Sequence, residues 1–222
     1  MKIKKVTTAD GSNSLSLVGQ NEQYHSKHGA LQEAKHVYIE SALSYFFESN
    51  PSCQKAKVLE VGFGTGLNTL LSWLFVNQFK SELHYTSIEA FPLEWKDVES
   101  LNYPELLYIP IEKFQCIHNL SWEVFHQLDS NFRFRKVEIK LEKINFINEF
   151  DVVFFDAFGP RTQPELWEKP ILQKIHQAMK ISGVFVTYSA KGQVRRNLME
   201  VGFRVQKIPG PPGKREMLRA TK

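Results

Sequence analysis

The sequence predicts an α/β fold in which helices flank one mostly parallel sheet of seven strands. Apolar, strand-like runs alternate with helix-like segments along most of the 222 residues, which is the pattern of right-handed strand–helix–strand crossovers. A glycine-rich turn separates the first of these strands from its helix. Two short runs around a Pro-Gly-Pro-Pro-Gly turn close the chain and predict an antiparallel hairpin.

An N-terminal extension, residues 1–50, precedes the regular part of the chain. It begins with short polar segments, and a helix is expected over 32–48, ending near Asn50 and Pro51. We expect this extension to pack as a lid on one main domain, residues 51–222. A chain of this length has room for a single well-buried α/β core.

The main domain alternates strands and helices in a regular order. A short buried strand is expected at 58–61, directly before the glycine-rich turn. Further strands are expected over 83–89, 132–141, 151–156 and 183–190. Helices are expected over 67–79, 92–101, 165–180 and 192–202, and the terminal hairpin over 203–208 and 214–220. Residues 102–131 lack a regular pattern and are interpreted as an insertion.

Composition and charge restrict the class of protein and its partners. The net charge is +4, and basic residues concentrate in 191–222, where only Glu200 and Glu216 oppose them. This mild excess permits a nucleic-acid partner without requiring one. The N-terminus lacks the apolar run of a signal peptide, and no stretch approaches the roughly 18 apolar residues of a membrane span. We expect a cytoplasmic monomer that does not bind membranes.

Neither a metal site nor a disulfide is expected. Cys53 and Cys116 are the only cysteines, and they lack the spacing of a zinc site. His25, His28 and His36 are the histidines that invite a metal interpretation. Their spacing does not place them on one helical turn, and no carboxylate pattern completes a ligand set.

The glycine-rich turn spans Glu60 to Asn68 and reads Glu-Val-Gly-Phe-Gly-Thr-Gly-Leu-Asn. Glycines at alternate positions let the backbone turn tightly, so that a ligand can lie against the main chain. A dinucleotide site requires glycine where this chain has Leu67. The spacing is instead typical of methyltransferase loops, and Glu60 is then placed to bind the ammonium group of a methyl donor. A tight turn without a ligand is the alternative.

Two further acids end predicted strands. Glu89 closes the second strand, about twenty residues beyond the loop, where this fold places a carboxylate for ribose hydroxyls. Asp156 closes the fourth strand, at the sheet edge where ligands react. A carboxylate there either positions a nucleophilic amine or takes its proton. A helix-capping glutamate and a buried turn aspartate are the alternatives. Four residues at the end of the next strand are candidates for the acceptor pocket: Thr187, Tyr188, Ser189 and Lys191.

Four blocks of sequence are informative when taken together: LEVGFGTGLN, SIEAFPL, FFDAFGPRTQPELW and the ending YSAKGQVRRNLMEVGF…GPPGKREML. They resemble the methyltransferase domain of the MnmC family, and the stretch YHSKHGALQEAKHVYIE is similar to that family's lead-in. The resemblance spans nearly the whole chain in the same order. It implies a Rossmann-like class I methyltransferase fold that uses S-adenosyl-L-methionine.

The resemblance also implies a substrate and a set of site residues. The acceptor is the 5-aminomethyl group on the wobble (thio)uridine of tRNA, which gains one methyl group to become 5-methylaminomethyl. Glu89 would bind the donor's ribose, and Asp156 would lie beside the acceptor amine. The residues that would hold the rest of the donor are Glu60, Gly62, Phe63, Gly64, Thr65, Gly66 and Asn68.

This chain departs from the family pattern in two places. Two-domain members continue into a flavin-dependent oxidase, and that activity is expected to be absent because this chain ends after KREMLRATK. The acid expected near the donor's adenine, after the third strand, does not align. Glu142 is the nearest candidate for it, and Lys143 stands at the position assigned to it.

A tRNA substrate would explain the basic C-terminal region, because Lys and Arg contacts to phosphates supply most sequence-independent affinity. The candidates for these contacts are Arg195, Arg196, Lys214 and Arg215; solvated surface charge is the alternative. Three rival functions stay open: methylation of a small-molecule amine, aminopropyl transfer on the same fold, and non-catalytic RNA binding. The intact glycine loop, Glu89 and Asp156 disfavour the last of these.

Overall fold

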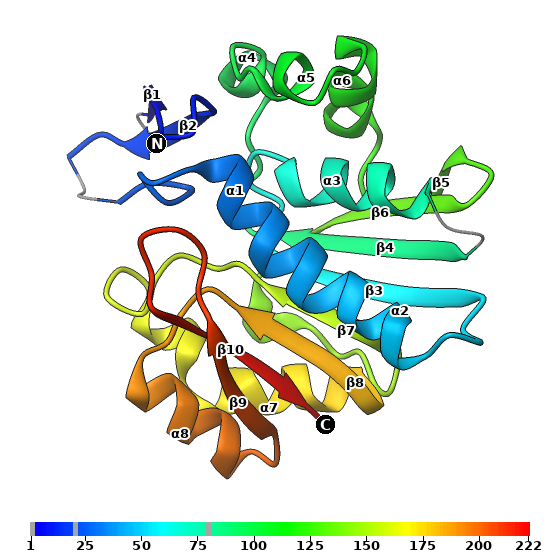
Figure 1. The fold of residues 1–222 in the computed structure, drawn as a ribbon, viewed down its shortest axis with the longest axis vertical. Coiled ribbons are helices and arrows are strands. Elements are labelled where there is room, and N and C mark those ends of the chain that lie inside the picture. Colours follow the sequence, from blue (N-terminus) through cyan, green and yellow to red (C-terminus); the bar gives the residue numbers. More distant parts are fainter. Residues whose placement is uncertain (1–2, 20–21, 79–80) are drawn as a thin grey trace.

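The computed structural model describes residues 3–19, 22–78 and 81–222, and its elements follow the predicted alternation (Figure 1). Eight strands form one sheet in the order β5-β6-β4-β3-β7-β8-β10-β9. Strands β6, β4, β3, β7 and β8 pair in parallel, whereas β5 and β10 pair antiparallel with their neighbours. The bounds of the inner strands are β3 Lys55–Val61, β4 Glu82–Glu89, β6 Phe132–Glu138, β7 Phe150–Phe155 and β8 Met179–Thr187.

The sheet has one strand more than the seven expected. The additional strand is β5 (His126–Asp129), which pairs antiparallel with β6 at the sheet edge. It lies in the stretch interpreted as an insertion, which also contains α5 (Tyr103–Leu106) and α6 (Ile111–Asn119). The C-terminal hairpin of β9 (Arg204–Pro209) and β10 (Glu216–Thr221) is confirmed.

One face of the sheet is covered by a long helix from the N-terminal region and by α3 (Leu67–Val76) (Figure 1). The long helix consists of α1 (Ala30–Ala34), the π-helical segment η1 (Lys35–Ser44) and α2 (Tyr45–Ser49). Buried residues of this helix, of α3 and of the sheet form one continuous apolar core. The expected N-terminal extension therefore contributes to the main core. An antiparallel pair, β1 (Ile3–Thr7) and β2 (Asn13–Leu17), precedes the helix.

The opposite face carries α7 (Lys169–Ala178) and α8 (Gly192–Glu200), which pack together and against β8 and β9. Their apolar sides share a second core with the sheet. Two short 3₁₀ turns, η2 (Leu141–Lys143) and η3 (Pro164–Trp167), lie in the connections around β7.

Three predicted helices are clearly shorter than expected, and the one expected over 165–180 is confined to α7 because β8 already begins at Met179. The helix expected over 92–101 is confined to α4 (Trp95–Val98), which begins with a capping box between Glu94 and Asp97. The helix expected to reach Phe79 ends at Val76, and Phe79 itself lies outside the described residues. In the described ranges, no helix combines the length and apolar character that crossing a membrane requires.

Candidate active site

A cavity of about 1060 Å³ lies at the carboxyl ends of β3, β4 and β7. Because parallel strands point the same way, the loops that follow them meet at this edge of the sheet. The segment before α1 and the loop between β9 and β10 complete the walls, and both lie near this edge in Figure 1. The volume suits a nucleotide-sized ligand with room for part of a second one.

The glycine-rich turn forms one wall through its backbone. Gly62 and Gly64 line the cavity with φ angles of 92° and 49°, a region that side chains rarely adopt. A Cβ atom at Gly62 would lie 2.9 Å from the carbonyl oxygen of Asp156. The loops after β3 and β7 therefore approach each other so closely that only glycine fits at position 62.

Glu89 lies at the end of β4 and lines the same wall. Its Oε2 accepts a hydrogen bond from the Gly64 N–H at 3.0 Å, and its Oε1 accepts from the N–H groups of Ala90 and Phe91, both at 2.9 Å. The carboxylate is thus held by three backbone donors next to the glycine-rich turn. Its remaining lone pairs can accept hydrogen bonds from a vicinal diol, so this wall fits a ribose.

Beyond Glu89, the cavity wall is formed by apolar residues and by one acid, Glu142. Ile88, Ile139 and Leu141 line it, which suits the flat face of an adenine ring. Glu142 is exposed and lines the cavity, whereas Lys143 is not among the lining residues of the described chain. The structure therefore places Glu142, and not its neighbour, where an adenine contact is expected.

Four residues assigned to the donor do not line the cavity: Glu60, Phe63, Gly66 and Asn68. Glu60 is fully buried, and its Oε2 accepts a hydrogen bond from the Thr69 hydroxyl at 2.9 Å. Burial raises the pKa of Glu60 to about 8, so this carboxyl is largely neutral at pH 7. A direct contact of Glu60 with the donor's ammonium group stays a prediction.

The other members of this group support the loop from below. The Phe63 ring packs against His118 and Phe134 with centroid distances of 5.1 and 6.0 Å. The Asn68 amide donates to the Oδ2 of Asp156 at 2.8 Å. Asn68 therefore orients the candidate catalytic acid, a role that its place in the motif did not reveal.

Asp156 follows β7 directly and lines the floor of the cavity. The buried hydroxyl of Tyr38 donates to its Oδ1 at 2.5 Å. Removal of water from the carboxyl raises the pKa of Asp156 to about 7, and the nearby charge of Glu33 adds to this rise, although both hydrogen bonds oppose it. A carboxyl that titrates near neutrality and is held by two donors can orient an amine or accept its proton.

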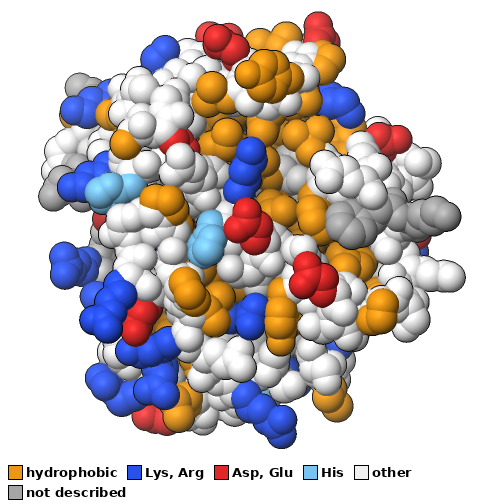
Figure 2. Space-filling view, viewed as in Figure 1, with side chains coloured by type: hydrophobic (Ala, Val, Ile, Leu, Met, Phe, Trp, Pro, Cys, Tyr) orange, Lys and Arg blue, Asp and Glu red, His pale blue; other side chains and the backbone are white. Residues whose placement is uncertain are grey.

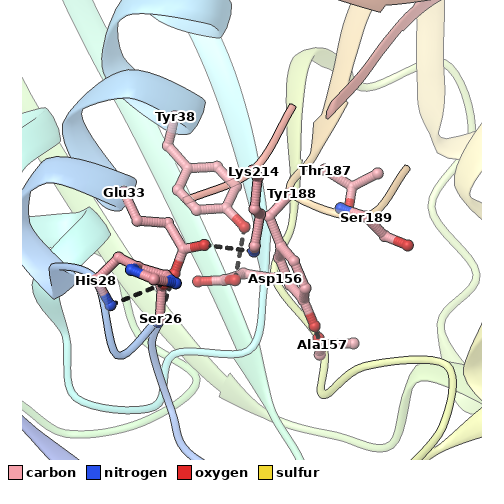
Figure 3. Close-up of polar contacts among 10 residues, drawn as sticks. All are labelled: Ser26, His28, Glu33, Tyr38, Asp156, Ala157, Thr187, Tyr188, Ser189 and Lys214. Atoms are coloured by element: carbon pink, nitrogen blue, oxygen red, sulfur yellow. Dashed lines mark hydrogen bonds and ion pairs between the residues drawn. The ribbon is translucent and has the colours of Figure 1, made fainter. Parts of the chain in front are cut away.

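A second charged group closes the cavity beside Asp156. Figure 3 shows Glu33, from α1, meeting Lys214, from the loop between β9 and β10. The Lys214 Nζ lies 2.6 Å from the Oε1 of Glu33 and 4.2 Å from the centroid of the Tyr188 ring. The Tyr188 hydroxyl donates to the Ala157 carbonyl at 2.9 Å. These contacts join three loops into one wall, which we call the Glu33–Lys214 clasp.

Of the four residues proposed to contact nucleic acid, Lys214 belongs to this clasp and lines the cavity. Arg196 and Arg215 are exposed, and Arg195 is half-buried on α8. The Arg196 guanidinium donates to the Gln193 side chain at 2.7 Å. Figure 2 shows Lys and Arg side chains gathered at the lower left, on the side of the molecule where α8 lies in Figure 1.

Two of the three histidines have other contacts. The half-buried His25 shares a hydrogen bond of 2.8 Å with the Ser14 hydroxyl, and desolvation lowers the pKa of His25 to about 4. His36 donates to the Pro209 carbonyl at 2.9 Å, next to the clasp. Over the described ranges 3–19, 22–78 and 81–222, no group of three or more His, Cys, Asp or Glu side chains is placed to hold a metal ion.

Comparisons with known proteins identify the family. The model of an S-adenosyl-L-methionine-dependent methyltransferase family matches residues 114–222. The tRNA 5-methylaminomethyl-2-thiouridine biosynthesis bifunctional protein MnmC of Leptospira interrogans is 32% identical over 217 residues, which are 93% of this chain and 34% of the relative. The MnmC of Hydrogenovibrio crunogenus is 30% identical over 209 residues, which are 89% of this chain and 31% of that relative.

The crystal structure of MnmC2 from Aquifex aeolicus superposes with a TM-score of 0.81 at 27% identity and covers 99% of this chain and 70% of that one. The chain belongs to the S-adenosyl-L-methionine-dependent methyltransferases. The expected fold is thereby confirmed, and S-adenosyl-L-methionine is the cofactor of this methyltransferase. The chain spans about a third of the length of the MnmC relatives, 34% and 31% in the two cases.

Spermidine synthase from Thermotoga maritima has the same fold, with a TM-score of 0.58 at 18% identity, and covers 98% of this chain and 67% of that one. This likeness concerns the fold alone. It explains why aminopropyl transfer was a reasonable rival on the basis of the sequence.

Proposed function

We propose that this methyltransferase transfers a methyl group to the nitrogen of the 5-aminomethyl group on the wobble (thio)uridine of tRNA. The observation that carries the proposal is Asp156, which lies on the cavity floor beside the glycine-rich turn with a pKa raised to about 7. An amine must be neutral to attack, and a carboxyl of this kind serves that requirement. The names of the MnmC relatives supply the substrate class.

Methyl transfer is an in-line displacement, so positioning supplies most of the rate. The donor, when bound, supplies an electrophilic methyl group on a sulfonium. A bond forms between the amine nitrogen and that methyl carbon as the carbon–sulfur bond breaks, and the nitrogen then loses a proton. Tyr38 and Asn68 hold the carboxylate of Asp156 in one orientation, and that carboxylate receives a hydrogen bond from the amine or its proton.

We further propose that residues 1–50 act as a wall or lid over the acceptor, because Glu33 of this segment lines the cavity and Tyr38 bonds Asp156. The methyltransferase is proposed to act in the cytoplasm, where its substrate is found, and as a monomer. Size-exclusion chromatography with light scattering tests the last point, and a dimer would refute it.

The decisive experiment incubates the purified protein with methyl-labelled S-adenosyl-L-methionine and tRNA from cells that lack this methylation step. The tRNA is then digested and the labelled nucleoside is identified. Label in 5-methylaminomethyl(thio)uridine supports the proposal. Donor binding by calorimetry without label in tRNA would move the acceptor to a small amine. Absence of donor binding would leave a non-catalytic RNA-binding protein.

The pH dependence of the reaction is expected to report Asp156. A pKa raised to about 7 means that this carboxyl is protonated below that pH and can no longer accept a hydrogen bond or proton from the amine. We expect kcat/KM at saturating donor to fall as the pH drops through about 7, by roughly tenfold per unit for one titrating group. Asp156→Asn should remove the part of this fall that the carboxyl causes and leave only the part that protonation of the substrate amine causes. A wild-type profile that stays flat between about pH 5.5 and 7.5 would refute the assignment.

The half-buried Arg195 and the exposed Arg196 of α8 are expected to contribute to tRNA binding. The double change Arg195→Glu, Arg196→Glu should weaken binding and lower the slope of log affinity against log salt, because phosphate contacts release counterions. Fluorescence anisotropy of labelled tRNA over a range of salt concentrations measures both quantities. An unaltered slope would place the RNA elsewhere.

A further inference from the structure

Half of one sheet face lacks a covering helix. Strands β6 and β7 are joined by residues 139–149, which contain only η2, whereas parallel strands are usually joined by a crossover helix. The apolar residues of this connection cover the carboxyl-terminal half of the face, and α7 packs against β8. The amino-terminal halves of β3, β4 and β6 are left facing a groove of about 310 Å³.

Strand register brings basic side chains together in this groove. Lys57 of β3 pairs with His84 of β4, which pairs with Arg133 of β6, so these three residues form one row across the sheet. Arg135 lies two residues farther along β6 on the same face, beside the groove and not among its lining residues. Lys55 stands two residues before Lys57 and also lines the groove.

The charges of the groove do not cancel. Lys55 pairs with Glu82 at 3.3 Å, and Lys57 pairs with Glu149 at 3.6 Å. His84 contacts Glu82. Burial lowers the pKa of His84 below its ordinary value, so this imidazole is mostly neutral at pH 7. Among the described residues, no carboxylate lies within 4.0 Å of the Arg133 or Arg135 guanidinium groups. Two positive charges are therefore left uncompensated.

The same two guanidinium groups are held in place by one aromatic ring. The central carbons of Arg133 and Arg135 lie 4.5 and 4.4 Å from the centroid of Phe125. The Nε of Arg135 is buried and has no hydrogen-bond partner. One Arg135 N–H group donates to the Thr86 hydroxyl at 3.5 Å, and no side-chain acceptor bonds the Arg133 guanidinium among the described residues. Stacking fixes the Arg133 plane, and a fixed guanidinium favours bidentate contact with phosphate oxygens.

We propose that this groove binds backbone phosphates of the tRNA at a point distant from the reacting uridine. The groove lies at the amino-terminal edge of the sheet, and the cavity lies at the carboxyl-terminal edge. Along β3, Lys57 in the row of the groove and Val61 at the cavity are four residues apart, which is about 13 Å at about 3.3 Å per residue. The inference rests on the proposed tRNA substrate and adds a second contact to it. Phosphate contacts position an RNA without reading its sequence.

The test compares two RNAs and two variants by fluorescence anisotropy over a range of salt concentrations. The RNAs are the full-length tRNA and its isolated anticodon hairpin. The first variant, Arg133→Gln with Arg135→Gln, removes both charges. The second, Arg133→Lys with Arg135→Lys, keeps them and controls for loss of stacking. Thermal unfolding and methylation of the hairpin establish that each variant is folded and that its active site is intact.

We expect the glutamine variant to bind full-length tRNA about tenfold more weakly, with a salt slope smaller by about 1.4 to 1.8 for two lost contacts. The lysine variant should keep most of the slope, and hairpin binding should not change. Equal loss for both RNAs, or no loss for either, would overturn the inference. The inference would also be overturned if polyglutamate of the same charge competed for the groove as well as tRNA does, because the partner would then be an acidic protein. Failure of the wild-type protein to methylate any tRNA would refute the proposed function separately.

Discussion

Asp156→Ala is expected to lose most of the methyl-transfer rate while keeping donor binding. The carboxyl lies on the acceptor side of the cavity, whereas the donor wall consists of the glycine-rich turn, Glu89 and the apolar residues beyond it. Removal of a general base or an equivalent positioning group costs about 10²- to 10⁴-fold. Single-turnover transfer from labelled donor measures the rate, and calorimetry measures donor affinity. Unchanged turnover would exclude Asp156 from the mechanism.

Two asparagine variants refine this result. Asp156→Asn keeps the shape and an acceptor oxygen but cannot take a proton, so substantial residual activity would mark Asp156 as a positioning group and not a base. Asp151→Asn is the matched control, because Asp151 lies at the other end of β7 and pairs with Lys180 at 2.8 Å. It should keep normal turnover, although the change weakens the contacts of Asp151 with Lys180 and with the Lys57 N–H at 2.8 Å.

Gly62→Ala is expected to abolish measurable donor binding and to lower the melting temperature. The new Cβ would lie 2.9 Å from a backbone oxygen of Asp156, and the φ of 92° is itself unfavourable for alanine by about 1 to 3 kcal/mol. The backbone has to shift, which displaces the turn and the floor of the cavity together. Calorimetry with S-adenosyl-L-methionine and thermal unfolding measure the two effects.

Gly11→Ala separates the clash from the backbone strain. Gly11 has a similar φ of 82°, but nothing lies within 4 Å of a Cβ placed there. This variant should lose a similar amount of stability from the strain alone and bind the donor normally. Normal donor affinity in Gly62→Ala would show that the turn does not form the donor site.

Much of the fold could be predicted because strong local signals agree with one another. Apolar strands, glycines at alternate positions and a terminal Pro-Gly turn each indicate the same α/β order. The predictions failed where local signals are weak. β5 (His126–Asp129) is short, half-exposed and lies at the sheet edge, and α5 has only four residues, so neither shows a clear period. The eighth strand therefore could not be recognised.

Acids that end strands were easier to place than the other residues of the glycine-rich motif. Glu89 and Asp156 end strands, and topology alone places strand ends at one edge of the sheet. Glu60 lies in a strand buried on both faces and Asn68 in the buried first turn of α3, so the sequence gives no sign of whether their side chains reach the cavity. The structure shows that these two support the site from below.

Tyr38 and Glu33 were missed as individual residues because their roles depend on distant partners. Tyr38 bonds a carboxylate 118 positions away, and Glu33 pairs with Lys214 across 181 positions. No local pattern encodes such contacts. Lys214 was noticed for its charge, yet in the structure it is paired and faces the cavity.

The Glu33–Lys214 clasp has a consequence for the order in which the protein matures on the ribosome. Its two halves are 181 residues apart in the chain, and β10 follows Lys214 directly. The glycine-rich turn and Glu89 emerge far earlier in synthesis. The acceptor wall has to wait for the β9–β10 hairpin. The clasp can therefore close only when nearly the whole chain has been synthesised.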